Sequence, residues 1–476
     1  MSFKRCVIVL ADGSRFDVFS ELLAEGALPN IKRHLVDNGS FRKAVSAFPS
    51  TTGPAHIPFL TGCLPATCNV PGIRWFDKDL YAERGHGSML TLGAHGRYRS
   101  YVGIETFRIN SDIKSDVKSI FELVPKSYCI FNSINKGVGS GNLTRIMRIW
   151  YWYYGHMTDR WRFVDKSAVK KALGVFKKDF EFLFVVMPGI DEYSHLAHPR
   201  HESAIAQYKY LDKGVGEMAE RLKAEGRWDD TIFLIVSDHG LSATKNHFCI
   251  NSFLESRGIK TFYFPLIYRK DFSAASMVSG NGMAHVYFKR AGGWGGRASF
   301  EDVFDMYPGL VDELVKESAV DVAAMTERTG GVVVITKRGI ARIRLDAGKV
   351  TYSCKGADPL GYGLDGKEVT EGEREFLLRT VDSDYPDAPY QLAHIFNSPR
   401  AGDLVLSATP GHDLRVKYEF PEHKASHGSL HREHMVVPIV TNIKLPEGPL
   451  RTVDVFPIYL RLMGREGPGN IDGRLF

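Results

Sequence analysis

The sequence has no long uninterrupted apolar run, although 44% of its 476 residues are hydrophobic. A helix that crosses a bilayer needs about 20 consecutive apolar residues, so no stretch of this chain predicts a membrane span. The apolar part of the first segment, MSFKRCVIVLADG, is too short for a signal peptide and has no small-residue cleavage site. We therefore interpret this segment as a first buried strand.

Paired cysteines and basic clusters are absent as well. The six cysteines form no CxxC pair and no regular framework, which favours reduced thiols in a cytoplasmic enzyme. The net charge is +6, but no Lys/Arg run or basic repeat suggests a surface for a nucleic-acid polymer. The composition instead favours a small anionic substrate. The sequence does not determine the oligomeric state, and an oligomer is compatible with it.

Strands alternate with helices through the first half of the chain. Buried strands are predicted in CVIVLADG and at 40–47, 127–132, 182–187 and 231–236. This alternation is typical of an α/β protein with a doubly wound, mostly parallel sheet. The pattern then changes to hairpins around a predicted helix at 300–318, which indicates an inserted α+β cap. The predicted division is 1–266 for the first part of a catalytic core, with an insertion near 90–170, then 267–397 for the cap and 398–476 for the second part of the core.

Acidic and histidine residues follow several of the predicted strands. In α/β proteins, the ends of the strands are where ligands bind. Mixed Asp/His ligation with open positions suits zinc, with manganese as a second choice, so we predict a centre for two divalent ions. The candidate ligands are Asp12, Asp191, His195, Asp238, His239 and His427. A hydroxyl nucleophile would complete such a centre, and the segment FPSTTGPAH offers Thr51 and Thr52.

Six segments, taken in order, resemble the alkaline phosphatase superfamily, and most closely its nucleotide pyrophosphatase/phosphodiesterase (type I phosphodiesterase) branch. They are VIVLADG, FPSTTGPAHIPFLTG, IDEYSHLAHP, IVSDHG, SHGSLHREHMVVPI and TVDVFPIYLRLMG. The resemblance covers roughly residues 5–75, 180–250 and 400–476 but not the predicted cap. It implies an alkaline-phosphatase-like core.

The resemblance also implies roles for the candidate residues. The family pattern F-P-x-x-T-x-P-x-H matches Thr52, rather than Thr51, as the nucleophile, and His56 as a residue that orients the loop. Without a Cys or Ser at position 52, a sulfatase is disfavoured. The implied ligands are Asp191, His195 and His427 for one metal ion, and Asp12, Asp238, His239 and Thr52 for the other.

These roles predict a two-metal phosphoric ester hydrolase, most simply a phosphodiesterase. Thr52 would attack phosphorus in line and form a phosphothreonine intermediate, because a bound metal ion lowers the pKa of a hydroxyl group. One alternative is a phosphomonoesterase or a phosphonate hydrolase of the phosphonoacetate type. Another, from a different class, is a catalytically silent binding protein that retains the fold.

Recognition of the substrate is less well marked in the sequence. Most members of the branch have an Asn, which contacts a phosphoryl oxygen, where this chain has Ile73. Asn69 and Arg74 are the neighbouring candidates to replace it. Further candidates are Lys136 for an anionic substrate, Trp150 for an apolar leaving group, and His285, for which a structural role in a strand is favoured. We expect residues 90–170 and the cap to cover the site and to set substrate preference.

Overall fold

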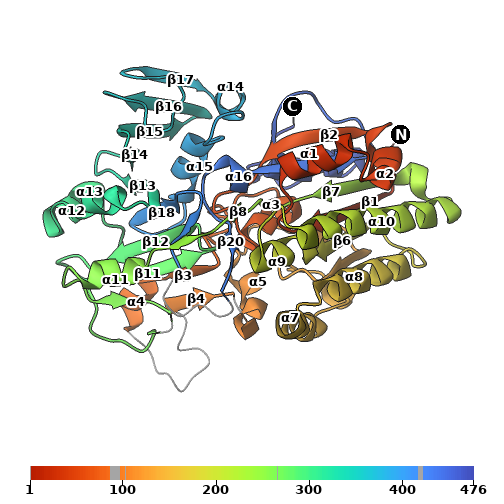
Figure 1. Ribbon diagram of the computed structural model, residues 1–476, viewed down its shortest axis with the longest axis horizontal. Helices are drawn as coiled ribbons and strands as arrows, with labels where there is room; N and C mark the ends of the chain where they lie inside the picture. The colour runs from red at the N-terminus through yellow and green to blue at the C-terminus, as the bar shows by residue number, and fades with distance from the viewer. Residues whose placement is uncertain (1, 86–96, 102, 265, 416–421, 476) are drawn as a thin grey trace.

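The computed structural model describes residues 2–85, 97–101, 103–264, 266–415 and 422–475, and its elements are labelled as in Figure 1. Its central sheet has seven strands in the order β22-β2-β21-β7-β1-β6-β5. The strands are β1 (Arg5–Ala11), β2 (Ser40–Val45), β5 (Ser127–Ile130), β6 (Phe182–Met187), β7 (Thr231–Val236), β21 (Val436–Thr441) and β22 (Leu450–Arg451).

Most neighbouring strands of this sheet run parallel. β5, β6, β1 and β7 are parallel to one another, whereas β21 runs antiparallel to both β7 and β2. β6 and β7 are buried along their whole length, which explains their unbroken apolar runs, because strands covered on both faces have no polar side to show. The α/β prediction is confirmed.

Helices cover the central sheet. Figure 1 shows α8 (Trp161–Val175), α9 (Gly189–Leu196) and α10 (Glu202–Ala224) lying along β6. Helix α17 (Val455–Leu462) packs with α3 (Ile57–Thr61), and its Tyr459 ring contacts Phe182 of β6. Within the described ranges, no helix combines the length and the apolar character that a membrane crossing requires.

A second sheet of nine strands has the order β10-β11-β12-β18-β13-β14-β15-β16-β17. Its strands are β10 (Thr261–Phe262), β11 (Ala274–Ser279), β12 (Met283–Phe288), β13 (Val320–Thr326), β14 (Val332–Ile335), β15 (Ile340–Asp346), β16 (Lys349–Cys354), β17 (Glu368–Gly372) and β18 (Leu404–Ala408). The sheet thus extends beyond the predicted insert at both ends. β18 lies in the predicted second part of the core, yet it pairs with β12 and β13 of the second sheet. A short buried apolar run carries no information about the sheet that it joins. The predicted domain boundaries stay predictions.

One helix of the second half differs from the prediction. The single helix expected at 300–318 is two helices, α12 (Phe300–Met306) and α13 (Leu310–Lys316). Pro308 and Gly309 separate them, because Pro disfavours a helical conformation in the residue before it and Gly309 takes a left-handed φ of 79°. The hairpins predicted in this half of the chain are present at 332–354, where β14, β15 and β16 form an antiparallel meander.

Candidate metal centre

The order of the central strands brings the predicted ligands to one edge of the sheet. Asp12 directly follows β1, and Asp238 lies two residues after β7. Helix α9 begins after β6 and carries Asp191 and His195 one turn apart. β8 (Ser242–Ala243) begins three residues after His239 and pairs with β20 (Ala425–Ser426). His427 directly follows β20, so this pairing brings His427 close to His239. All six candidate side chains are buried.

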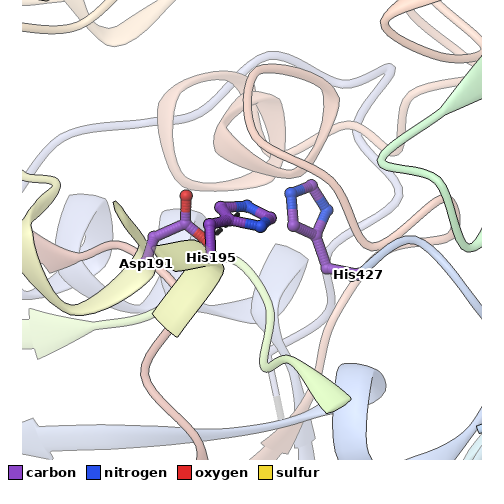
Figure 2. A group of neighbouring side chains, drawn as sticks. All are labelled: Asp191, His195 and His427. Carbon is purple, nitrogen blue, oxygen red and sulfur yellow. Dashed lines mark ion pairs between the residues drawn. The ribbon is translucent and has the colours of Figure 1, made fainter. Parts of the chain in front are cut away.

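The first cluster consists of Asp191, His195 and His427, whose ligand atoms lie within 4.8 Å of one another (Figure 2). His195 Nδ1 donates to the backbone oxygen of Ala425 at 2.8 Å, which leaves Nε2 directed at Asp191 Oδ1, 3.4 Å away. Asp191 Oδ1 and His427 Nδ1 are buried without a hydrogen-bond partner. Buried polar atoms are seldom left in that state, so these two atoms fit the ligands of a cation.

The second cluster contains Asp12, Asp238 and His239, with Thr52 beside them. His239 Nε2 lies 3.5 Å from Asp12 Oδ1 and 3.3 Å from Asp238 Oδ2. Asp12 also forms a compact group with Asp191 and His239. The rings of His239 and His427 stack with their centroids 3.9 Å apart. The two clusters therefore adjoin, as a two-metal centre requires.

The hydroxyl group of Thr52 lies at this junction. Thr52 Oγ1 is 3.0 Å from His239 Nε2 and 3.4 Å from Asp12 Oδ1, and the residue is half-buried. Thr51 is fully buried, and its Oγ1 has no hydrogen-bond partner. Of the two hydroxyl groups that the sequence offers, only that of Thr52 contacts the acidic and histidine cluster.

The pKa values of the clustered side chains are shifted by burial and by the charges of their neighbours. Burial, followed by repulsion from Asp238 and Asp191, raises the pKa of Asp12 well above its usual value. Burial would also raise the pKa of Asp238, but His239 and a hydrogen bond with His56 lower it to about 2. Burial would lower the pKa of His195, but Asp191 raises it to about 9. A bound cation would relieve the repulsion among these carboxylates, so the donor set fits divalent metal ions.

Three further residues belong to the neighbourhood. His56 Nε2 lies 3.0 Å from Asp238 Oδ2, and its Nδ1 lies 2.9 Å from Asn132 Oδ1, so His56 braces the carboxylate from behind. Arg148 Nε donates to the Phe131 carbonyl, and burial lowers the pKa of Arg148 to about 10 although Asp12 attracts its positive charge. The sequence suggested His56 by its motif. It gave no sign of Asn132 or Arg148, because no pattern marks contacts between distant loops.

The second sheet holds His427 in place. The turn between β11 and β12 runs beside it, where His427 N donates to the Gly280 oxygen at 3.0 Å and Gly282 N donates to the His427 oxygen at 2.7 Å. Gly280 has φ of 62°, and a Cβ there would lie 2.5 Å from His427 Nδ1 and 2.8 Å from Thr51 Oγ1. Position 280 therefore has no room for a side chain.

We expect Gly280→Ala to weaken metal binding and to lower the Tm, because the added methyl group must displace His427. The matched control is Gly258→Ala, since Gly258 has φ of 74° but a Cβ added there would have no other atom within 4 Å. The control carries only the backbone strain of about 1–2 kcal/mol. Metal titration followed by thermal unfolding measures both effects, and equal losses of metal affinity in the two variants would contradict this account.

Two of the predicted substrate-binding residues are occupied by structural contacts. Lys136 Nζ donates to the carbonyl oxygens of Lys114 and Val117. His285 is fully buried in β12, where Nε2 donates to the Pro71 oxygen and Nδ1 accepts from Gly402 N. Burial lowers the pKa of His285 to about 4. Both side chains stabilise the loops around them.

The other three candidates lie in different surroundings. The side-chain oxygen of Asn69 accepts from Ser398 Oγ at 2.7 Å, away from the clusters. Arg74 Nε donates to Ser100 Oγ, and Arg74 N approaches Ser279 Oγ, next to the Gly280 turn. Trp150 lies on α7 (Met147–Thr158) with 66% of its surface exposed. Among these, Arg74 is the residue whose contacts connect it to the site through that turn.

A buried carboxylate supports the start of α9. Asp165 Oδ1 accepts from Gly189 N at 3.2 Å, and burial raises the pKa of Asp165 to about 7. The unfolded value is about 3.9, so the folded state holds a proton that the unfolded state releases between those pH values. This group's contribution to stability is therefore lost as the pH rises from about 4 to about 7.

We expect Asp165→Asn to remove this pH dependence, because an amide keeps the oxygen that accepts from Gly189 and carries no charge. The gain in the free energy of unfolding should be small near pH 4 and reach up to about 4 kcal/mol by pH 8. Thermal unfolding of both proteins across this range provides the measurement. A Tm difference that does not grow with pH would contradict the assigned titration.

Comparison with known proteins identifies the family of this chain. The model of the type I phosphodiesterase/nucleotide pyrophosphatase family matches residues 6–430. The chain belongs to this family. Phosphonoacetate hydrolase from Sinorhizobium meliloti, solved with phosphonoacetate, is similar with a TM-score of 0.58 and 14% identity, covering 97% of this chain and 96% of that one. Murine ectonucleotide pyrophosphatase/phosphodiesterase 5, solved with AMP, has a TM-score of 0.56 and 12% identity, with coverage of 98% and 96%.

Two curated relatives are larger proteins. A GPI ethanolamine phosphate transferase 1 from Gibberella zeae is 21% identical over 267 residues, which are 51% of this chain but only 24% of that protein. Its counterpart from Chaetomium globosum is 28% identical over 96 residues, 20% of this chain and 10% of its own length. This type I phosphodiesterase family member thus matches about a quarter, or less, of these relatives.

Proposed function

We propose that this family member is a two-metal hydrolase of phosphate esters, that its preferred substrates are diesters, and that Thr52 is its nucleophile. The observation that carries the proposal is the position of Thr52 Oγ1, 3.0 Å from His239 Nε2 and 3.4 Å from Asp12 Oδ1, where the two acidic and histidine clusters adjoin. A hydroxyl group held at such a junction is suited to attack on phosphorus.

The donor set indicates which residues would hold the metal ions. One ion would take the first cluster, and the other would take the second cluster with Thr52. Mixed carboxylate and imidazole ligation favours zinc, with manganese as the second choice. When bound, two such ions lower the pKa of the attacking hydroxyl group and neutralise charge on the phosphoryl oxygens.

The protein's own residues supply the nucleophile and hold the metal ligands in position. Thr52 Oγ forms a bond to phosphorus as the bond to the leaving oxygen breaks, which gives a phosphothreonine ester. Water then cleaves that ester and releases Thr52, so that configuration at phosphorus is retained overall. His56, held by Asn132, fixes the orientation of Asp238. The positive charge of Arg148 on α7 favours anionic substrates near Asp12.

Phosphonate hydrolysis is the second candidate, supported by the likeness to phosphonoacetate hydrolase. Transfer of the phosphoryl group to an alcohol in place of water is a further candidate, because the curated relatives are named as phosphate transferases. A phosphomonoesterase would use the same clusters. A catalytically silent protein is disfavoured, because all six candidate ligands and the hydroxyl group are present together. A cytoplasmic location remains part of the proposal.

A substrate panel tests the choice among these activities. The protein, loaded with zinc, is assayed with bis-p-nitrophenyl phosphate, p-nitrophenyl phosphate and phosphonoacetate. We expect the highest kcat/KM with the diester. A preference for the monoester or for the phosphonate would replace the diester proposal with the corresponding alternative. No turnover of any ester by fully loaded protein would favour the silent binding protein.

A further inference from the structure

One face of α7 is apolar and exposed. Trp150, Tyr153 and Met157 of α7 follow Ile146, the residue just before the helix, at spacings of four, three and four residues, which places all four along one side. Their exposed fractions are 68%, 66%, 52% and 83%. We call these four residues the α7 stripe. Figure 1 shows α7 at the periphery of the molecule, beyond α8.

The opposite face of α7 accounts for the packing of the helix. Tyr151 contacts the Phe131 ring at 4.8 Å, and Trp152 contacts the Trp161 ring at 5.9 Å. Gly155 lies against Trp161 so closely that a Cβ would approach the indole ring to 2.7 Å. The inward aromatic residues therefore hold α7 to the fold, and the stripe is not needed for that purpose.

Exposed apolar side chains are concentrated at this place. The described residues include fourteen large hydrophobic side chains that are exposed, and seven of them lie between residues 146 and 163. Single exposed apolar residues are common on soluble proteins, but a contiguous group of them marks an interaction surface.

The exposed charges in the segment that carries the stripe and in the first part of α8 are mainly positive. Between residues 145 and 170, the exposed basic residues are Arg145, Arg160, Arg162, Lys166 and Lys170. Asp159 is the exposed acidic residue there, since Asp165 is buried. A helix with Trp, Tyr and Met on one side and basic residues around it is suited to lie in the interface of an anionic bilayer. An acidic headgroup layer complements this surface in charge, and the acyl region complements the stripe.

We propose that the α7 stripe docks the protein on the surface of a bilayer that contains anionic phospholipids. The inward face of the same helix is connected to the candidate site, because Arg148 Nε donates to the Phe131 carbonyl. The next residue, Asn132, holds His56 against Asp238. Docking would therefore bring the metal centre near the headgroup layer. If the proposed function holds, the preferred diesters are phospholipid headgroups. This assignment of the substrate rests on the proposed function, whereas the docking does not.

The test uses the full chain and vesicles of phosphatidylcholine with about a third phosphatidylserine, in which the anionic headgroups attract basic residues. We expect the protein to sediment with these vesicles, and we expect binding to weaken as salt is added, because the basic residues are screened. The variant Tyr153→Gln/Met157→Gln should lose at least about tenfold in vesicle partitioning, because its apolar contacts are removed.

The matched control is Phe304→Gln/Leu378→Gln. These residues are 54% and 50% exposed, and they lie on α12 and α14 (Glu373–Thr380), in other parts of the chain. We expect unchanged partitioning for the control and unchanged hydrolysis of soluble bis-p-nitrophenyl phosphate for both variants. Equal losses of binding in both variants, or no sedimentation of the wild-type protein at low salt, would overturn the docking proposal.

The assays also separate this proposal from the proposed function. Vesicle binding without hydrolysis of any ester would reject the function and leave the docking in place. Hydrolysis of soluble diesters by a protein that never binds vesicles would reject the docking alone. A stable dimer of the wild-type protein that dissociates in the variant Tyr153→Gln/Met157→Gln would show that a second copy of the chain covers the stripe. That result would reject the bilayer as the partner of this surface.

Discussion

Replacing Thr52 by alanine is expected to lower kcat for a phosphodiester by about 10⁴-fold or more, since removal of a covalent nucleophile costs that much in well-studied enzymes. The six other predicted metal ligands remain in this variant, so its metal content and Tm should stay close to those of the wild type. Thr52 is half-buried, and its hydroxyl group contacts Asp12 and His239. Steady-state kinetics on protein loaded with zinc provides the measurement.

Thr51→Ala is the matched control for this prediction. Thr51 is the adjacent residue of the same type, but its hydroxyl group is buried and does not contact the acidic cluster. We expect a much smaller loss of kcat for Thr51→Ala. A larger loss for Thr51→Ala than for Thr52→Ala would show that the nucleophile is assigned to the wrong threonine.

Replacing His195 by alanine is expected to reduce metal binding from two ions per chain to one. His195 is one of the three members of the first cluster, and its ring is held in place by the Ala425 carbonyl. A bound metal ion stabilises the charge of the transition state by several kcal/mol, so loss of one ion should lower kcat by about 10³-fold. Elemental analysis of protein saturated with zinc, together with kinetics, measures both effects.

His198→Ala serves as the control, because His198 lies one turn further along the same sequence and imitates the spacing of a ligand. The structure gives it an exposed position, where it accepts from Arg200 N and contacts the His201 ring. We expect wild-type metal content and activity in this variant. Two bound ions in His195→Ala, or a single ion in the wild type, would contradict the two-metal account.

The strands of the central sheet could be predicted because their sequences are unambiguous. The predicted strands at 182–187 and 231–236 coincide with β6 and β7, since fully buried parallel strands need continuous apolar side chains. The residues after them were predicted to meet because parallel strands end at one edge of the sheet. The clustering of Asp12 with Asp238 and of Asp191 with His195 follows from this rule.

Other features depend on contacts that no local pattern encodes. β18 has the same apolar character as a core strand, yet it pairs with β12 and β13. The turn at Gly280 supports His427 from 147 positions away, and neither segment carries a sign of the other. Lys136 and His285 have residue types that suit ligand binding, but the fold supplies each with backbone partners. Pairing between distant segments decides these cases, and the amino-acid types alone do not.

Nucleophilic attack by Thr52 requires that a covalent phosphate ester forms on its hydroxyl oxygen during turnover. Protein loaded with zinc is mixed with bis-p-nitrophenyl phosphate, quenched in acid during turnover, digested and examined by mass spectrometry. We predict a p-nitrophenyl phosphoryl group on the peptide that contains Thr52, located by fragmentation to Thr52 and absent from Thr52→Ala. Steady hydrolysis without any modified peptide would contradict the account, because water would then attack phosphorus directly.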